Sequence, residues 1–109
     1  MSAWPPPPDL ASIKELVRDV DTEHFIANGS PTDEYDHEAE QLHAAVAHLQ
    51  TADLVVSNIL PHIEAIWSKS FAYDDEVLVK AHPDLEALAQ QIARFFGPEA
   101  KPQVREQSK

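Results

Sequence analysis

The fold is decided by residues 54–71, which read LVVSNILPHIEAIWSKSF. Apolar side chains recur in this stretch every three or four positions, the period that places them on one face of an α-helix. The stripe consists of Val55, Ile59, Ile63, Ile66, Trp67 and Phe71. Pro61 lies inside the stripe and lacks the N–H that a helix interior requires, at a cost of about 3 kcal/mol. The sequence therefore predicts a long, largely buried helix, capped by Thr51 or Asp53 and kinked or broken near Pro61.

Three further segments have the same helical period. A first helix is predicted over Asp9–Val20. A last helix is predicted from Pro83, which suits a first helical position, to a stop at Gly97-Pro98. A second helix is predicted from apolar positions near the middle of the chain, namely Ala39, Leu42, Val46 and Leu49. Residues 73–80 contain the run Val77-Leu78-Val79, which is too short to distinguish a strand from a helix.

Residues 21–35 lose the helical period and contain Asn28-Gly29-Ser30-Pro31, a combination typical of turns. Gly29 is one of only two glycines in the chain, and we expect it to adopt backbone angles that other residues avoid. Phe25 and Ile26 are apolar residues within this polar loop. We expect both side chains to tuck into the core and hold the loop in place.

Together these segments predict an all-α protein, a compact four-helix domain over residues 9–98. The chain of 109 residues is long enough for one domain of ordinary size. Residues 1–8 include four consecutive prolines and are predicted to form a polyproline II arm. Residues 99–109 are polar and aperiodic, and are predicted to form a disordered tail.

The composition excludes several classes of function. Eight Lys and Arg residues stand against 19 Asp and Glu residues, a formal net charge of -11. Nucleic acid and anionic membrane surfaces repel such a protein, so neither is expected as a partner. The chain has no cysteine, which excludes disulfides and thiol nucleophiles. No apolar run approaches the roughly 20 residues of a membrane span, and no secretion signal is visible. We expect a cytoplasmic protein.

The negative charge is concentrated between Asp19 and Glu40, where the chain has eight acids and neither Lys nor Arg. A surface of this kind raises the local potential and speeds association with a basic partner. The predicted binding face consists of Asp19, Asp21, Glu23, Asp33, Glu34, Tyr35, Asp36, Glu38 and Glu40, with Phe25 as a further apolar anchor. The alternative is a solvated loop followed by a helix start that the helix dipole favours.

A group of small bacterial proteins of unknown function resembles this chain from Phe25-Ile26 through the loop GSPTDEYD and into the second helix. The resemblance implies a compact helical domain of bacterial, cytoplasmic origin, and it implies no activity. Some members of the group look like immunity proteins that neutralise toxins. Within the loop, we expect the Tyr35 ring to pack under the helix start, with its hydroxyl bonded to a neighbouring carboxylate or backbone group. We expect Asp33 to cap the second helix.

No pattern of residues predicts an active site or a cofactor. The serines lie in no nucleophile elbow, and the two glycines are too isolated for a phosphate loop. Of the six histidines, His43 and His48 are five positions apart and lie on different faces of a helix. The protein is therefore expected not to be an enzyme, and to hold no cofactor.

Two alternative functions remain open beside the acidic binding face. Glu40 and His43 are three positions apart, as in di-iron helix bundles, although the motif occurs only once. One alternative is therefore a metal-binding helical protein that uses these two residues and loop carboxylates. The other is a homodimeric scaffold or regulatory domain, for which Val56, Val77 and Val79 would supply the exposed apolar surface.

Overall fold

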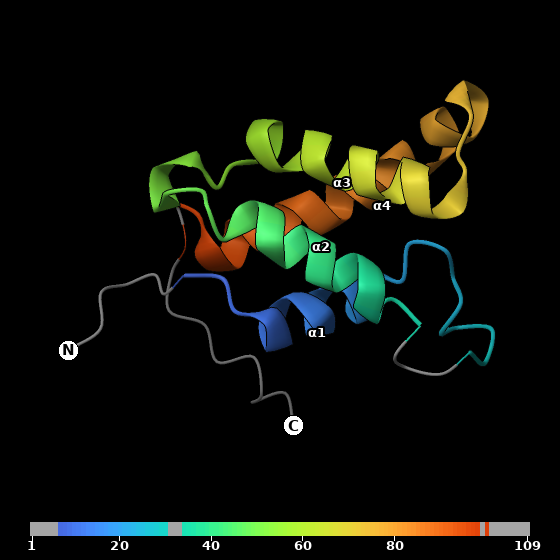
Figure 1. The fold of residues 1–109 in the computed structure, drawn as a ribbon, viewed down its shortest axis with the longest axis horizontal. Helices are drawn as coiled ribbons and strands as arrows, with labels where there is room; N and C mark the ends of the chain where they lie inside the picture. The colour runs from blue at the N-terminus through green and yellow to red at the C-terminus, as the bar shows by residue number, and fades with distance from the viewer. Residues whose placement is uncertain (1–6, 31–33, 99, 101–109) are drawn as a thin grey trace.

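The computed structural model describes residues 7–30, 34–98 and 100, and within them it contains helices and no strand. The elements in chain order are α1 (Leu10–Val20), α2 (Asp36–Val46), the short 3-10 helix η1 (Thr51–Asp53), α3 (Val56–Phe71) and α4 (Asp75–Phe96). α1 packs against α2 and α4, and α3 also packs against α2 and α4 (Figure 1). The predicted all-α, four-helix domain is confirmed.

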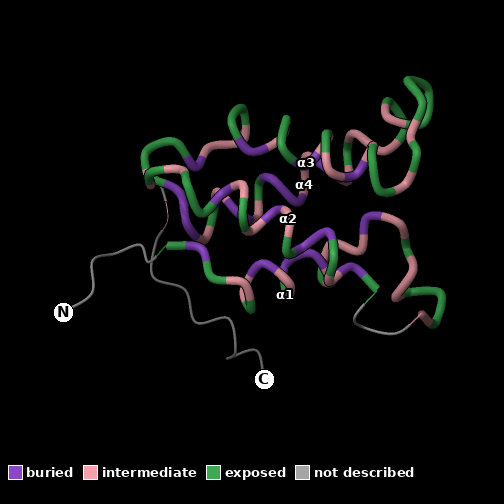
Figure 2. The backbone as a smooth tube through the Cα atoms, in the orientation of Figure 1, coloured by how far each residue is buried: buried purple, intermediate pink, exposed green. Residues whose placement is uncertain are grey.

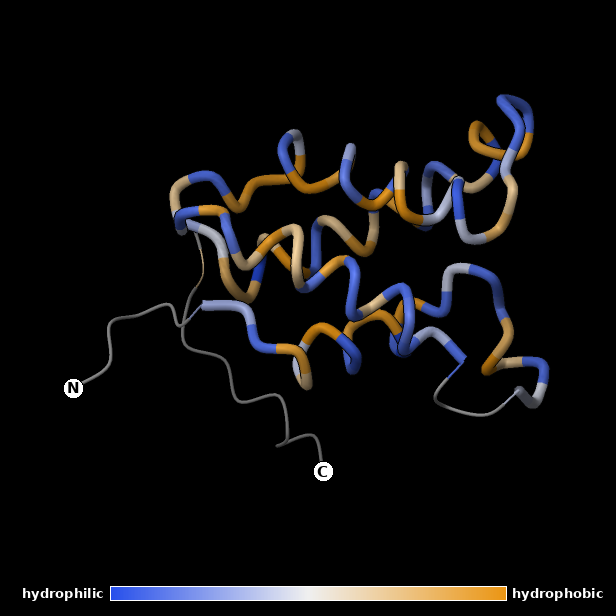
Figure 3. Tube along the Cα trace, in the orientation of Figure 1, coloured by the Kyte–Doolittle hydropathy of each residue, from blue (hydrophilic) through white to orange (hydrophobic). Residues whose placement is uncertain are grey.

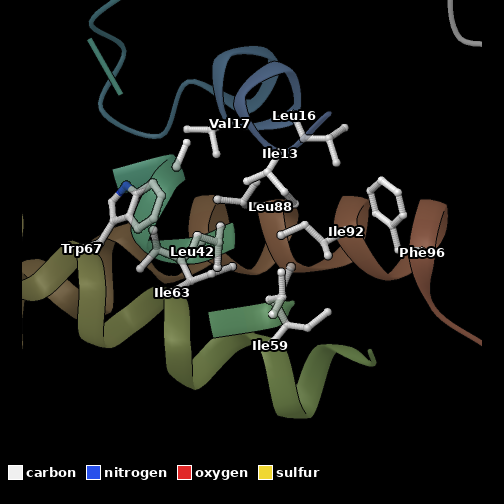
Figure 4. Packing of buried hydrophobic residues seen from close by; sticks show 14 of the residues in the cluster. Ile13, Leu16, Val17, Leu42, Ile59, Ile63, Trp67, Leu88, Ile92 and Phe96 are labelled. Atoms are coloured by element: carbon white, nitrogen blue, oxygen red, sulfur yellow. The ribbon is translucent and has the colours of Figure 1, made fainter. Parts of the chain in front are cut away.

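The apolar stripes of all four helices meet in one core (Figure 4). Trp67 is the largest fully buried side chain, and it lies on α3, the helix with the richest stripe. Full burial of a large apolar side chain stabilises a fold by about 1.5–3 kcal/mol. The helical members of the core are Ile13, Leu16, Val17, Ala39, Leu42, Val46, Ile59, Ile63, Trp67, Leu85, Leu88, Ala89, Ile92 and Phe96.

α1 begins and ends close to the prediction. The Asp9 side chain accepts a hydrogen bond from the Ser12 amide at 3.0 Å, which caps the helix. The helix ends at Asp21, whose backbone is left-handed with φ of 50°.

α2 begins after Tyr35, which forms no side-chain cap. The predicted cap, Asp33, lies outside the described residues.

α3 differs from the prediction at its start and at Pro61. The helix begins at Val56 after Val55, with no side-chain cap, because Thr51 and Asp53 lie in η1. The predicted break is not found: α3 runs through Pro61 as one helix, and the kink is not confirmed. Ser57 and Pro61 are both exposed. The carbonyl group that Pro61 deprives of a donor therefore lies on the solvent side of the helix.

The predicted start of the last helix at Pro83 is wrong. α4 begins at Asp75 and contains Pro83 in its interior, so the ambiguous residues after Asp74 form its first turns. Asp74 caps the helix by accepting a hydrogen bond from the Val77 amide at 2.8 Å. Two acids, Asp75 and Glu76, then lie in the first turn, where the helix dipole favours them. The predicted end is confirmed, because Gly97 terminates α4.

The predicted terminal segments fall mostly outside the described residues. Residues 1–6 of the predicted arm and all of 99–109 except Ala100 are not described. Pro8 is buried, and its carbonyl oxygen lies 3.2 Å from Nε2 of His43 on α2.

Replacing Ala72 with glycine is expected to stabilise the protein by about 0.5–1 kcal/mol. Ala72 ends α3 in the left-handed conformation, with φ of 53°, where a Cβ atom is unfavourable. The measurement is the urea midpoint of unfolding. Ala65→Gly is the matched control, because Ala65 is an exposed residue inside α3 where glycine is expected to lower the midpoint. A lower midpoint for Ala72→Gly would contradict the left-handed cap.

Candidate protein-binding surface

The start of the loop, residues 21–23, is held in place by the side chain of Tyr35. The Tyr35 ring is buried. Its hydroxyl donates a hydrogen bond to Oδ1 of Asp21 at 2.7 Å and accepts one from the Glu23 amide at 2.8 Å. The structural role that the sequence predicts for Tyr35 is therefore confirmed. Because its ring is buried, Tyr35 does not belong to an exposed binding face.

Asp21 is the acceptor around which the loop folds. Its carboxylate also accepts hydrogen bonds from the amides of Ile26 at 3.1 Å and Ala27 at 2.9 Å. Burial acts to raise the pKa of Asp21, but the Tyr35 hydroxyl and these two amides outweigh it and lower the pKa below the ordinary value of 3.8. The negative charge of Asp21 therefore stabilises hydrogen bonds within the loop.

Two further hydrogen bonds join the loop to α3 and to the residues that follow it. Nε1 of Trp67 donates to Oγ1 of the buried Thr22 at 2.7 Å. The Tyr73 hydroxyl donates to the Glu23 carboxylate. Burial, followed by the bond to this carboxylate, raises the pKa of the Tyr73 hydroxyl above its ordinary value. Glu23 therefore connects segments that lie far apart in the sequence.

Aromatic rings continue this junction into the core. The Phe25 ring lies 5.6 Å from the Tyr35 ring and 5.8 Å from the Phe71 ring, measured between centroids. The Phe71 ring in turn lies 6.4 Å from the Trp67 ring. Phe25 and Ile26 pack against the core, and Gly29 has φ of 98°, as predicted. Phe25 is half-buried among these rings and anchors the loop.

The structure divides the predicted acidic face into internal and exposed residues. The Asp36 carboxylate lies 3.6 Å from Nζ of Lys14 and 3.7 Å from Nη2 of Arg18, so two bases of α1 offset its charge. Glu38 is buried, and it cannot contribute to an exposed face. Asp33 lies outside the described residues. The exposed members of the predicted face are Asp19, Glu34 and Glu40.

A second group of acids lies beside this loop, and sequence reasoning did not connect the two. Asp74, Asp75 and Glu76 are all exposed at the start of α4. The Tyr73–Glu23 hydrogen bond places this segment against the loop, and Nε2 of His24 lies 3.9 Å from the Asp84 carboxylate of α4. The run of acids was visible in the sequence, but its position beside residues 21–24 depends on the packing.

We call this surface the acidic end. It consists of Glu23, Glu34, Asp74, Asp75, Glu76 and Asp84. Figure 1 shows the loop and the α3–α4 turn at the same end of the molecule, away from the first residues of α1. Both segments carry runs of hydrophilic residues (Figure 3). The bases of the α3–α4 corner are Lys69 and Lys80, so acids outnumber bases there.

The described residues provide no metal centre. Glu40 is exposed, and Nε2 of His43 faces the Pro8 carbonyl instead of a carboxylate. His82 lies between two carboxylates, with Nδ1 3.4 Å from Glu64 and Nε2 3.9 Å from Glu86. These two contacts use opposite sides of the ring. Over residues 7–30, 34–98 and 100, no group of three or more His, Asp or Glu side chains is arranged to hold an ion.

The predicted apolar surface for a homodimer is only partly present. Val77 and Val79 are exposed as predicted, whereas Val56 is half-buried. Residues two positions apart point to different sides of a helix, so Val77 and Val79 do not form one continuous face.

Comparisons with protein-family models, curated proteins and solved structures found no match to this chain. A bilayer-spanning helix would need to be longer or more apolar than any that the structure describes.

Proposed function

We propose that this protein binds another protein, and that its partner presents a basic surface to the acidic end. The observation that supports the proposal is that the half-buried Glu23 of the loop lies beside the exposed acids at the start of α4. Two acidic segments at one end of a helical bundle create a stronger field than either segment alone. Such a field increases the association rate and selects partners of opposite charge.

The most concrete form of this proposal is an inhibitor or immunity-type protein that covers a basic enzyme or toxin. A nuclease groove, for example, is built to accept phosphate, and a rigid array of carboxylates presents a similar charge. The internal hydrogen bonds of Asp21 and Glu23 support this form, because they hold residues 21–27 in one conformation before binding. Glu34, Asp75 and Glu76 would face the partner.

Reversing the charge of Asp75 and Glu76 to lysine is expected to weaken binding about tenfold or more at low salt. The measurement begins with capture of a partner from a lysate of the native organism, followed by binding assays with the purified partner. Elution of a basic protein in stoichiometric amount between about 0.15 and 0.5 M salt would agree with an electrostatic interface.

The matched control changes the net charge equally at the opposite end of the bundle. It combines Gln50→Lys, Asp53→Lys and Ser57→Lys, all at exposed residues around η1. If this control weakens binding as much as Asp75→Lys with Glu76→Lys, net charge alone determines the affinity, and the acidic end is not the binding site.

A further inference from the structure

The two halves of α4 differ sharply in their burial. The structure describes every residue between Trp67 and Leu85, and none of them is buried (Figure 2). In contrast, Leu85, Leu88 and Ile92 are fully buried in the second half of the helix. The first turns of α4 therefore have the backbone of a helix but no fully buried side chain. Segments with few buried contacts open with low free energy.

Two backbone features lie at the ends of this poorly anchored segment. Ala72 has the left-handed conformation, with φ of 53°, and it separates α3 from the residues that follow. Pro83 has no N–H, so the carbonyl group of Val79 has no helical donor at that point. Rotation at these two points breaks the bond from the Tyr73 amide to the Ser68 carbonyl and the helical bonds that cross Pro83. Once detached, the short helical segment 75–82 is too short to remain helical in water, so its amides are exposed.

Few contacts hold the segment against the bundle. Its apolar contacts with the core come from three partly buried residues, Tyr73, Leu78 and Ala81, and the Tyr73 ring stacks on the Phe71 ring at a centroid distance of 6.2 Å. The Tyr73 hydroxyl donates to Glu23, and Nδ1 of His82 lies 3.4 Å from the Glu64 carboxylate. Both polar contacts are partly exposed, and such contacts stabilise a fold only modestly.

We propose that residues 73–82, the α4 arm, detach from the bundle as a unit while the rest of the protein stays folded. The arm rotates about Ala72 and Pro83. The Tyr73–Glu23 hydrogen bond keeps the arm against the bundle, and we call this bond the latch. Opening uncovers the half-buried Phe71 ring and moves Asp75 away from the loop. The arm thereby controls whether the acidic end is assembled, and the opening itself requires no partner.

Native-state hydrogen exchange, followed by NMR at low urea concentrations, tests the proposal on the unmodified protein. Amides of Val79 to His82 are expected to exchange at least about 100-fold faster than those of Leu88 to Ile92, by local opening. Their exchange is also expected to be nearly independent of urea, because local opening exposes little surface. Equal exchange rates with the same urea dependence in both groups would overturn the proposal.

Variants test the latch and the rotation point at Pro83 separately. Tyr73→Phe removes only the hydroxyl and is expected to accelerate exchange in the arm about fivefold, with Leu88 unchanged. Pro83→Ala restores an amide donor and is expected to slow exchange in the arm. Val79→Thr is the matched control, because Val79 is 73% exposed and a similar shape is kept. If Tyr73→Phe accelerates Leu88 as much as the arm, then the arm and bundle unfold together and the latch is refuted.

Discussion

Replacing Trp67 with alanine is expected to lower the free energy of unfolding by about 3–5 kcal/mol, the largest effect of any single substitution considered. The indole ring is fully buried in α3, and it contacts the Phe71 ring at a centroid distance of 6.4 Å. Removing it leaves a cavity in the core. It also leaves the buried hydroxyl of Thr22 without the indole donor.

Urea unfolding followed by circular dichroism measures this loss, because the substitution removes a fluorescent side chain. Trp67→Phe is a useful comparison, because it keeps part of the ring volume and removes the bond to Thr22. Its expected loss is about 1–3 kcal/mol. Val77→Ala, at an exposed position, is expected to change the stability by less than about 0.5 kcal/mol. A similarly small effect of Trp67→Ala would contradict the full burial of this side chain in the core.

Replacing Asp21 with alanine is expected to destabilise the protein by about 2–4 kcal/mol at neutral pH. Three donors lose their acceptor in this variant: the Tyr35 hydroxyl and the amides of Ile26 and Ala27. Tyr35→Phe removes one partner of the same network. The two substitutions combined are expected to cost less than the sum of the separate effects, because they break one shared bond.

The stabilisation by Asp21 is expected to depend on pH in one direction. Its pKa in the folded protein is lower than the ordinary value of 3.8, so folding favours the ionised carboxylate. The contribution is present in full above the pKa of the unfolded chain and is lost as the pH falls through the folded pKa. The stability difference between the unmodified protein and Asp21→Asn should therefore shrink below about pH 4.

Asp53→Asn is the control for this pH dependence, because Asp53 is an exposed carboxylate outside the loop. The free energy of unfolding of this variant is expected to change with pH in the same way as that of the unmodified protein. A constant difference between the unmodified protein and Asp21→Asn from neutral to acidic pH would show that the charge of Asp21 does not stabilise the loop.

The candidate site could be predicted from the sequence only in part. The acidic loop was recognisable by its composition. The structural role of Tyr35 followed from its side chain, which combines an apolar ring with a polar hydroxyl. The pairing of Asp36 with Lys14 and Arg18 was not predictable, because it depends on how α1 and α2 face each other. The same holds for Asp74 to Glu76, which join the loop acids only through the packing of α4.

The helical period by itself determined the fold class and the core position of Trp67, and the pair Gly97-Pro98 determined the end of the last helix. These features depend on residues within one or two turns of each other, and the sequence contains that information directly. Tertiary structure alone decided that Pro83 lies inside a helix and that Tyr73 bonds to Glu23, 50 positions away. The exposed first turns of α4 need no apolar period of their own. The cap at Asp74 starts them, and the buried second half of the helix continues them. Long-range charge pairs likewise form only after the hydrophobic stripes have brought the helices together.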